Sequence, residues 1–173
     1  MIKFVFFGTP KFATIILEEL IKSGLKPQAE FRDPKESISV LTEKLINLKP
    51  DLGLIAAYGK ILPKEIFEIP HHGFINVHPS LLPKYRGASP IQTAILNGEK
   101  ETGATIIKID EEMDHGPIIS NVKIKISNND TYESLSQRMA RLGAELLIKI
   151  IPDYISGKIK PVEQDHSKAT YAK

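Results

Sequence analysis

Asn76 and His78 are the first residues in the sequence whose types and spacing could carry out chemistry. They stand two positions apart in the apolar segment Phe74–His78, so on a β-strand their side chains face the same way. Polar side chains on a buried strand cost free energy unless they are hydrogen-bonded, and a satisfied structural pair is the simpler interpretation. Their position at the end of the strand, directly before the proline-rich loop 79–83, favours a functional pair.

A second candidate is the acidic segment 110–116, Asp-Glu-Glu-Met-Asp-His-Gly. Its acidic spacing invites comparison with a calcium loop, but such a loop needs glycine at the sixth position, where this chain has His115. Two interpretations stay open. Either the segment is a hairpin-like turn with solvated carboxylates, or the Asp114 carboxylate points inward and pairs with a histidine.

Composition and the remaining motifs exclude several kinds of site. The chain has 173 residues and no cysteine, which excludes disulfides, thiolate zinc sites and a cysteine nucleophile. Gly8-Thr9-Pro10 lacks the spacing of a phosphate-binding loop, and no dinucleotide-binding glycine motif or nucleophile elbow occurs. The neighbours His71 and His72 have no third ligand nearby and are interpreted as loop residues. We expect no metal site.

The balance of charges limits the partners. The net charge is +2, from 23 basic and 21 acidic residues, so contact with a nucleic acid requires a local basic patch. The apolar runs are too short to span a bilayer, and the N-terminus lacks a signal-peptide pattern. We therefore expect a cytoplasmic protein without membrane contact.

Apolar strand-like segments alternate with helical patterns, which predicts an α/β fold with a mainly parallel sheet. The expected strands are 2–7, 52–57, 74–78, 102–109 and 118–126, and the expected helices are 11–22, 36–48, 64–69, 90–98 and 130–154. Thr9 and Ser89 are expected to cap helices, and Asp130 with Glu133 to form a capping box. Ligands of such sheets bind at the carboxyl ends of the strands, which is where Asn76 and His78 stand.

Two segments fit this pattern poorly. The strand at 2–7 is apolar on both faces and needs neighbours on both sides, but residues 26–33 are short, charged and bounded by prolines. We therefore predict that a strand and a loop are missing between the first two helices. The tail 158–173 is polar and is expected to run over the surface.

Longer motifs around the candidate residues resemble a known family. The segment Asn76–Pro83 reads Asn-Val-His-Pro-Ser-Leu-Leu-Pro, and Asp114 follows His78 by 36 residues within Met-Asp-His-Gly-Pro-Ile. This set is similar to the catalytic core of the folate-dependent formyltransferases. Within that superfamily, three further stretches resemble the methionyl-tRNA formyltransferases: Phe7–Ala13, Ala57–Pro63 and Gln164–Lys173. The resemblance implies one Rossmann-like formyltransferase catalytic domain over residues 1–173, with a mainly parallel twisted sheet flanked by helices.

The resemblance also implies a reaction, in which a primary amine attacks the formyl carbon of 10-formyltetrahydrofolate without a metal. Asn76 would donate a hydrogen bond to the developing oxyanion, a contribution of about 10²–10³ in rate. His78 would stabilise the same charge and manage the proton, typically about 10²–10⁴. Asp114 would orient His78 or hold a water that relays the proton.

The binding residues that the resemblance implies fall into two groups. The folate would lie between two segments and contact Lys60, Ile61, Leu62, Phe74, Ile109, Asp110 and Asp114. The amine substrate, initiator methionyl-tRNA, would contact Thr9, Pro10, Phe12, Lys84 and Arg86, the last two forming a basic patch.

The chain departs from the family in two respects. It stops at Lys173, before the C-terminal domain that helps to hold tRNA, and the segment at about 26–35 is shortened and lacks a basic, glycine-containing loop. We expect weak tRNA binding with a strong salt dependence. The alternatives are a formyltransferase for another amine, such as glycinamide ribonucleotide or an amino sugar, and a folate-binding module without tRNA activity. The ribonucleotide enzymes carry a glycine- and serine-rich loop that Gly8–Lys11 lacks.

Overall fold

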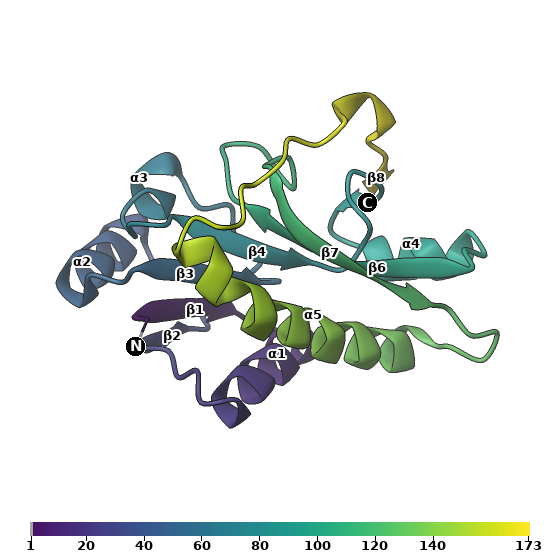
Figure 1. Cartoon of the computed structure of the whole chain (residues 1–173), viewed down its shortest axis with the longest axis horizontal. Helices are drawn as coiled ribbons and strands as arrows, with labels where there is room; N and C mark the ends of the chain where they lie inside the picture. The colour runs from purple at the N-terminus through teal and green to yellow at the C-terminus, as the bar shows by residue number, and fades with distance from the viewer. Residues whose placement is uncertain (1) are drawn as a thin grey trace.

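A six-stranded sheet with helices on both faces forms the centre of the molecule (Figure 1). The structure is a computed structural model that describes residues 2–173. Its strands are β1 (Phe4–Gly8), β2 (Ala29–Phe31), β3 (Leu52–Ala56), β4 (Phe74–His78), β5 (Arg86–Gly87), β6 (Glu101–Lys108), β7 (Ile118–Lys125) and β8 (Tyr171–Ala172). Its helices are α1 (Lys11–Lys22), α2 (Ile38–Leu48), α3 (Lys64–Phe67), α4 (Pro90–Leu96) and α5 (Tyr132–Ile155), followed by a 3-10 turn at His166–Lys168.

The order of strands in the main sheet is β2-β1-β3-β4-β6-β7. The first four are mutually parallel, β6 runs antiparallel to β4, and β7 runs antiparallel to β6. Every residue of β1 and β3 is buried, as expected for parallel strands covered on both faces. The predicted α/β class with a mainly parallel sheet is confirmed.

Two hydrophobic clusters lie on opposite faces of the sheet. One contains Ile75 and Val77 of β4 together with the buried faces of α1 and α5. The other contains Phe74 together with buried residues of α2 and α3. Because side chains alternate along a strand, Asn76 and His78 continue the face of Phe74. The paired aliphatic side chains on the opposite face anchor β4 and fix the direction of both polar residues.

The prediction that no strand follows α1 was wrong. Residues Ala29–Phe31 form β2, which pairs in parallel with β1 at the edge of the sheet. The Phe31 side chain is 4% exposed and stacks on Phe7 with ring centroids 4.3 Å apart. One buried ring therefore holds a three-residue strand in a segment whose local composition is unfavourable.

The helix caps differ from those expected. Thr9 does not cap α1: its hydroxyl lies 3.1 Å from the Tyr58 carbonyl oxygen, and Pro10 is the N-cap residue. Ser89 is the N-cap of α4 but makes no side-chain capping bond. The capping box of α5 pairs Thr131 with Ser134 in place of Asp130 with Glu133.

The tail is more than a surface segment, which corrects the sequence-based expectation. After α5 it crosses the upper side of the view in Figure 1 and ends in β8. Strand β8 pairs in parallel with β5, matching Arg86 with Tyr171. Within this tail, Gln164 is buried, with 4% of its surface exposed.

Candidate active site

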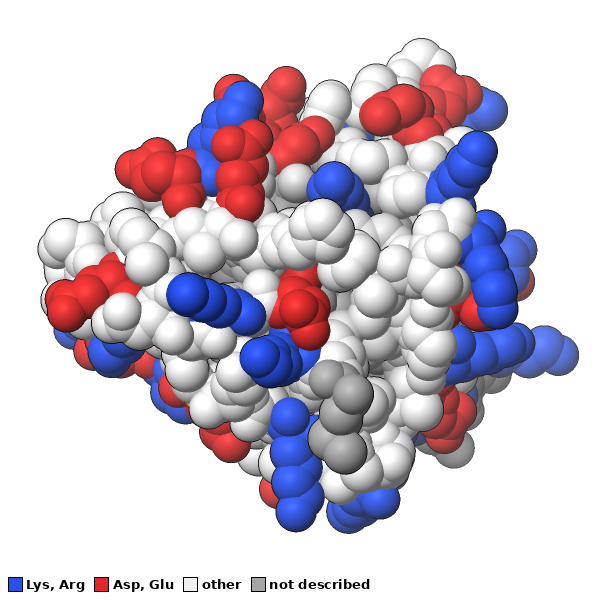
Figure 2. Space-filling view, turned by 60° about the vertical axis from the view of Figure 1, so that its left-hand side comes forward, with Lys and Arg blue, Asp and Glu red and all other residues white. Residues whose placement is uncertain are grey.

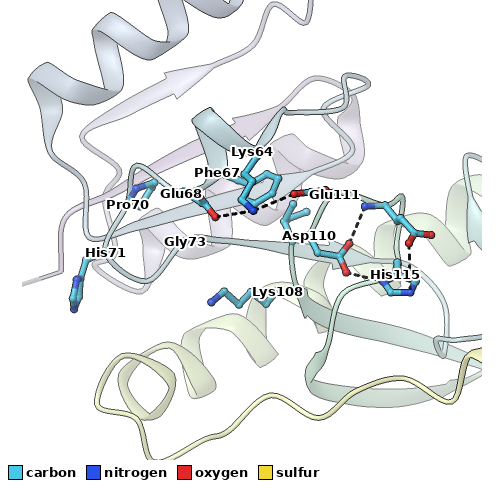
Figure 3. A pocket seen from close by; sticks show the side chains of 12 residues that line it. Lys64, Phe67, Glu68, Pro70, His71, Gly73, Lys108, Asp110, Glu111 and His115 are labelled. Atoms are coloured by element: carbon cyan, nitrogen blue, oxygen red, sulfur yellow. Dashed lines mark hydrogen bonds and ion pairs between the residues drawn. The ribbon is translucent and has the colours of Figure 1, made fainter.

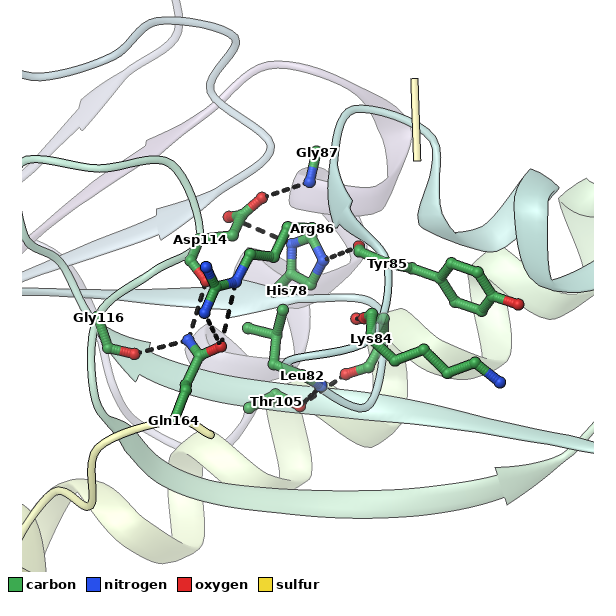
Figure 4. A network of polar contacts seen from close by, with 11 residues as sticks. His78, Leu82, Lys84, Tyr85, Arg86, Gly87, Thr105, Asp114, Gly116 and Gln164 are labelled. Carbon is green, nitrogen blue, oxygen red and sulfur yellow. Dashed lines mark hydrogen bonds and ion pairs between the residues drawn. The ribbon is translucent and has the colours of Figure 1, made fainter. Parts of the chain in front are cut away.

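His78 and Asp114 come together at the end of β4. Nδ1 of His78 lies 3.4 Å from Oδ1 of Asp114, and the two side chains are 4% and 11% exposed. The other ring nitrogen, Nε2, lies 2.8 Å from the carbonyl oxygen of Tyr85 (Figure 4). A carbonyl only accepts, so Nε2 carries a proton. The ring is thus held between the Tyr85 carbonyl oxygen on one side and the Asp114 carboxylate on the other.

Asp114 is held as a carboxylate by its surroundings. Burial alone would raise its pKa, but hydrogen bonds from His78 and from the Gly87 N–H, together with the Arg86 charge, lower the pKa below its usual value. The Gly87 N–H donates to Oδ2 at 2.8 Å. Both carboxylate oxygens are therefore engaged, one by His78 and one by the loop that follows β4.

Asn76 lies on the same face of β4 as His78 and is half-buried. In the register of the sheet its neighbours are Ile55 on β3 and Ile107 on β6. Among the described residues, none makes a hydrogen bond to the Asn76 amide, and no buried side-chain polar atom lacks a partner. The amide is accordingly in reach of solvent and can donate to a ligand.

Thr105 fixes the loop after β4. It lies opposite His78 in the register of β6, donates from its hydroxyl to the Ser80 carbonyl at 2.6 Å and accepts from the Leu82 N–H at 3.1 Å. The Ser80 hydroxyl in turn donates to the Lys84 carbonyl at 2.6 Å. These bonds curl the loop back so that the Tyr85 carbonyl meets His78.

The two segments expected to hold folate lie side by side. Lys64 Nζ at the start of α3 is 3.2 Å from Glu111 Oε1 in the acidic turn. Ile61, next to this contact, is 65% exposed, and Met113 in the acidic turn is 55% exposed. Ile61 and Met113 are large apolar side chains exposed to solvent on these two segments, and such a surface suits a flat, largely apolar ligand such as a pterin.

The other expected folate residues differ in accessibility. Phe74 is fully buried and meets Phe7 edge-on at 5.2 Å, so its ring presents no surface to a ligand, contrary to the expectation. Leu62 is buried at 4%, and Lys60 Nζ donates to the Glu36 carbonyl. Ile109 is half-buried, and its N–H donates to the Phe74 carbonyl at 2.9 Å.

Asp110 belongs to the acidic turn and to a cavity beside it. Its carboxylate accepts from the Glu112 N–H at 3.0 Å and lies 2.7 Å from His115 Nδ1. The cavity, about 670 Å³, lies between α3 and the end of β6 (Figure 3). It shares Ile109 and Asp110 with the expected folate residues and has none of Asn76, His78 and Asp114 in its lining.

The expected basic patch is not formed. Arg86 is 3% exposed, and its Nη2 donates to Gln164 Oε1 and to His166 Nδ1, both at 2.8 Å. Lys84 is exposed, but its ammonium group pairs with Glu99, which raises the pKa of Lys84. Arg86 is thus a buried structural cation. On the face drawn in Figure 2, basic and acidic side chains are likewise interspersed.

The three substrate residues expected after β1 are placed differently from one another. Thr9 and Pro10 are exposed at the carboxyl end of β1. Phe12 is 6% exposed and belongs to the core cluster under α5, so its ring is not open to a substrate. Of this group, only Thr9 and Pro10 are accessible.

Sequence reasoning missed Gln164 as a member of the site. Its Nε2 donates to the carbonyl oxygens of Asp114 at 2.9 Å and Gly116 at 2.8 Å, while its Oε1 accepts from Arg86 (Figure 4). The signal that could have found it is its place at the start of the motif Gln164–Lys173. The remaining missed groups, the Tyr85 carbonyl and the Gly87 N–H, are backbone atoms that side-chain motifs do not reveal.

Within residues 2–173, no group of three metal-ligating side chains is placed to hold an ion. Over the same residues, no helix has the length and hydropathy needed to cross a bilayer.

Comparison with known proteins decides the family. The sequence profile described as formyl transferase matches residues 9–151. The chain belongs to the formyl transferase family.

Curated relatives from this family are similar over nearly the whole chain. A methionyl-tRNA formyltransferase from Kosmotoga olearia is 42% identical over 200 residues, covering 98% of this chain and 64% of the relative. The corresponding protein from Hydrogenobaculum sp. is 50% identical over 137 residues, covering 79% of this chain and 45% of the relative. The chain thus spans less than two thirds of the length of these relatives.

Several solved structures share the fold. A methionyl-tRNA formyltransferase from Clostridium thermocellum has a TM-score of 0.73 at 21% identity, covering 99% of this chain and 72% of that one. A sugar N-formyltransferase from Shewanella sp. has a TM-score of 0.77 at 19% identity, covering 99% and 76%. HypX from Aquifex aeolicus, in complex with tetrahydrofolic acid, has a TM-score of 0.84 at 18% identity, covering 99% and 29%. At these identities the likeness concerns the fold alone.

Proposed function

We propose that this chain transfers a formyl group from 10-formyltetrahydrofolate to the amino group of initiator methionyl-tRNA. The observation that carries the proposal is the convergence of His78 and Asp114 at the end of β4, with the free Asn76 amide on the same strand face. Identities of 39–50% to curated methionyl-tRNA formyltransferases support this amine over others. Such a substrate would place the protein in the cytoplasm.

The folate supplies the formyl group, and the residues of the chain handle charge and protons. The amine nitrogen bonds to the formyl carbon while the bond from that carbon to the folate nitrogen breaks, and the proton that the amine loses is matched by one that the departing folate nitrogen gains. Asn76 donates an amide hydrogen bond to the formyl oxygen as negative charge develops there, while His78 assists the proton transfer and Asp114 holds the ring in place. His78 can contact the reacting groups only if one of its two polar contacts, to Asp114 or to the Tyr85 carbonyl, is exchanged, because the ring is almost fully enclosed.

The folate segments follow from the same proposal. Exposed Ile61 and half-buried Ile109 would form the apolar walls of the pterin site, with Lys60 and Asp110 at its polar margins. Phe74 and Leu62 are buried, so they would contribute only by packing against the backbone of these segments. Thr9 and Pro10 remain the accessible residues for contact with the amine substrate.

The shortened segment between α1 and α2 also remains part of the proposal. The Kosmotoga olearia relative aligns over 200 residues with 98% of this 173-residue chain, or about 170 residues, so about 30 aligned positions of the relative have no counterpart. We place this shortening at about residues 26–35, where β2 has only three residues. Its effect would fall on tRNA binding, since the formyl-transfer residues lie elsewhere.

A panel of amines tests the proposed function. Purified protein is mixed with 10-formyltetrahydrofolate and, in separate reactions, methionyl-tRNA, glycinamide ribonucleotide and an amino sugar, and the formylated product is identified by mass spectrometry. We expect formyl-methionyl-tRNA. If a formylated sugar or ribonucleotide is the only product, that amine is the substrate in place of methionyl-tRNA. Folate binding without any product would indicate a folate-binding module that does not transfer the formyl group.

A further inference from the structure

The two backbone segments that meet the His78 ring share an uncommon conformation. Tyr85, whose carbonyl oxygen faces Nε2, has φ +61°, and Asp114, whose carboxylate faces Nδ1, has φ +53°. Both values lie in the left-handed region, which residues other than glycine rarely adopt. Such a conformation persists only where the surrounding structure holds it, so something must fix both turns around His78.

The C-terminal strap, defined as residues 164–172, contacts the first of these turns. The Tyr85 N–H donates to the Thr170 hydroxyl at 2.9 Å, and the Arg86 N–H donates to the Thr170 carbonyl at 2.8 Å. The pairing of β5 with β8 continues this contact through Tyr171 and Ala172. Tyr85 is therefore flanked on one side by the strap and on the other by His78.

The same strap contacts the second turn through Gln164. Its amide nitrogen donates to the carbonyl oxygens of Asp114 and Gly116, which lie on either side of His115. Its amide oxygen accepts from Arg86, which immediately follows Tyr85. The oxygen and the nitrogen of one buried amide thus join the two turns that hold His78, as Figure 4 shows.

We propose that the C-terminal strap positions the His78–Asp114 pair for formyl transfer, with Gln164 and Thr170 as positioning residues. This inference rests on the proposed function for its chemistry. Its structural basis is that Gln164 lies 50 residues from Asp114 and Thr170 lies 85 residues from Tyr85 in the sequence, yet both side chains bond to the turns around His78.

Two substitutions of Gln164 separate positioning from stability. Gln164→Glu keeps an oxygen for Arg86, so the strap stays attached, but it places a carboxylate against the carbonyl oxygens of Asp114 and Gly116 and moves that turn. Gln164→Met has similar length and removes both links, leaving the buried Arg86 without its main acceptor. The matched control is Glu163→Gln, at the exposed neighbouring position of the tail.

A split between kcat and KM is the decisive readout. Small displacements of reacting groups can cost about 10²-fold in rate, so for Gln164→Glu we expect kcat to fall by at least about tenfold, with KM for 10-formyltetrahydrofolate within about twofold of the wild-type value. Gln164→Glu should lower the melting temperature less than Gln164→Met does, because it keeps the bond to Arg86, and Gln164→Met should lower kcat as well. A folded Gln164→Glu variant with wild-type kcat overturns the proposal.

Thr170 gives an independent test at the other turn. Thr170→Val keeps the shape of the side chain but removes the acceptor for the Tyr85 N–H, and it should lower kcat. Thr170→Ser keeps the hydroxyl, so its kcat should be close to the wild-type value. Equal kcat in the valine and serine variants would overturn the role of Thr170.

The environment of His78 can also be measured in the free protein, without the reaction. Nitrogen-15 NMR of the His78 ring reports which nitrogens carry a proton and what they contact. We expect the His78 signals to move in Gln164→Glu and to stay unchanged in Glu163→Gln. If wild-type protein formylates no amine, the proposed function fails while this comparison still decides the positioning: unmoved His78 signals in Gln164→Glu overturn it.

Discussion

Asp114 and His78 form a pair that links the acidic turn to the end of β4, with the carboxylate oxygen 3.4 Å from Nδ1 of the ring. Both side chains are nearly buried, so solvent screens their interaction little. The Gly87 N–H occupies the second carboxylate oxygen and ties the pair to the loop after β4. The geometry makes Asp114 the partner that fixes the orientation of His78.

The Asn76 amide should matter for rate and little for folding. It is half-buried, and none of the described residues makes a hydrogen bond to it, so Asn76→Ala removes no side-chain hydrogen bond among those residues. Loss of one donor to a developing oxyanion costs about 10²–10³ in rate, and at least about tenfold is expected here. Steady-state kinetics together with thermal unfolding measure both effects. Turnover near the wild-type level in a folded Asn76→Ala protein would remove Asn76 from the catalytic set.

The buried Asp114 carboxylate should make stability fall in acid. Its pKa is lowered in the folded protein, so its contribution is present above the unfolded pKa of about 3.9 and is lost as the pH falls through the lower folded value. The difference in unfolding free energy between wild type and Asp114→Asn should therefore shrink as the pH is lowered from 5 toward 2. Urea unfolding across this range measures it, and a difference independent of pH would contradict the ionised pair.

The edge strand β2 should contribute measurably to stability through one ring. Phe31 is 4% exposed and stacks on Phe7, and truncating a buried phenylalanine typically costs about 3–5 kcal/mol. Phe31→Ala should lower the unfolding free energy by about 3 kcal/mol. Ile46→Ala on α2, where the side chain is 54% exposed, serves as the control and should change little. Equal small losses in the two variants would mean that β2 is not a packed strand.

Binding of tRNA by this chain should be weak, and its salt dependence should be small, in contrast to the strong salt dependence expected from the sequence. Arg86 is buried and Lys84 is paired with Glu99, so few cations are free to displace counterions near the site. Each neutralised phosphate contributes about 0.9 to the log–log salt slope on duplex, so Lys84→Gln should lower the slope by no more than about this value. Fluorescence titrations at several salt concentrations measure it. Tight binding at physiological salt would show that the chain holds tRNA through a surface not identified in this account.

Local patterns were sufficient for much of the fold. The strand Phe74–His78 was predicted with both of its bounds, because a short apolar segment there is enclosed by glycine and proline. Helix α1 likewise begins and ends where its apolar spacing and Gly24 indicate. The inward-pointing Asp114 was one of two interpretations left open, and only the tertiary structure chooses it.

Three of the errors share one physical cause, which is stabilisation by residues distant in sequence. Strand β2 depends on the stacking of Phe31 against Phe7, and no pattern within residues 26–33 signals that contact. Arg86 was expected to form a basic patch with Lys84, but it is buried against Gln164, which stands 78 residues later. Gln164 itself lies in a polar tail whose composition favours solvent exposure.

The most direct test of the central claim compares formyl transfer to methionyl-tRNA by the wild-type chain and by Asp114→Ala, with equal amounts of protein shown to be folded by thermal unfolding. The account predicts that the wild-type chain forms formyl-methionyl-tRNA from 10-formyltetrahydrofolate and that the variant does so at least about tenfold more slowly, since the contact that orients His78 is lost. Equal rates in the two proteins would contradict it.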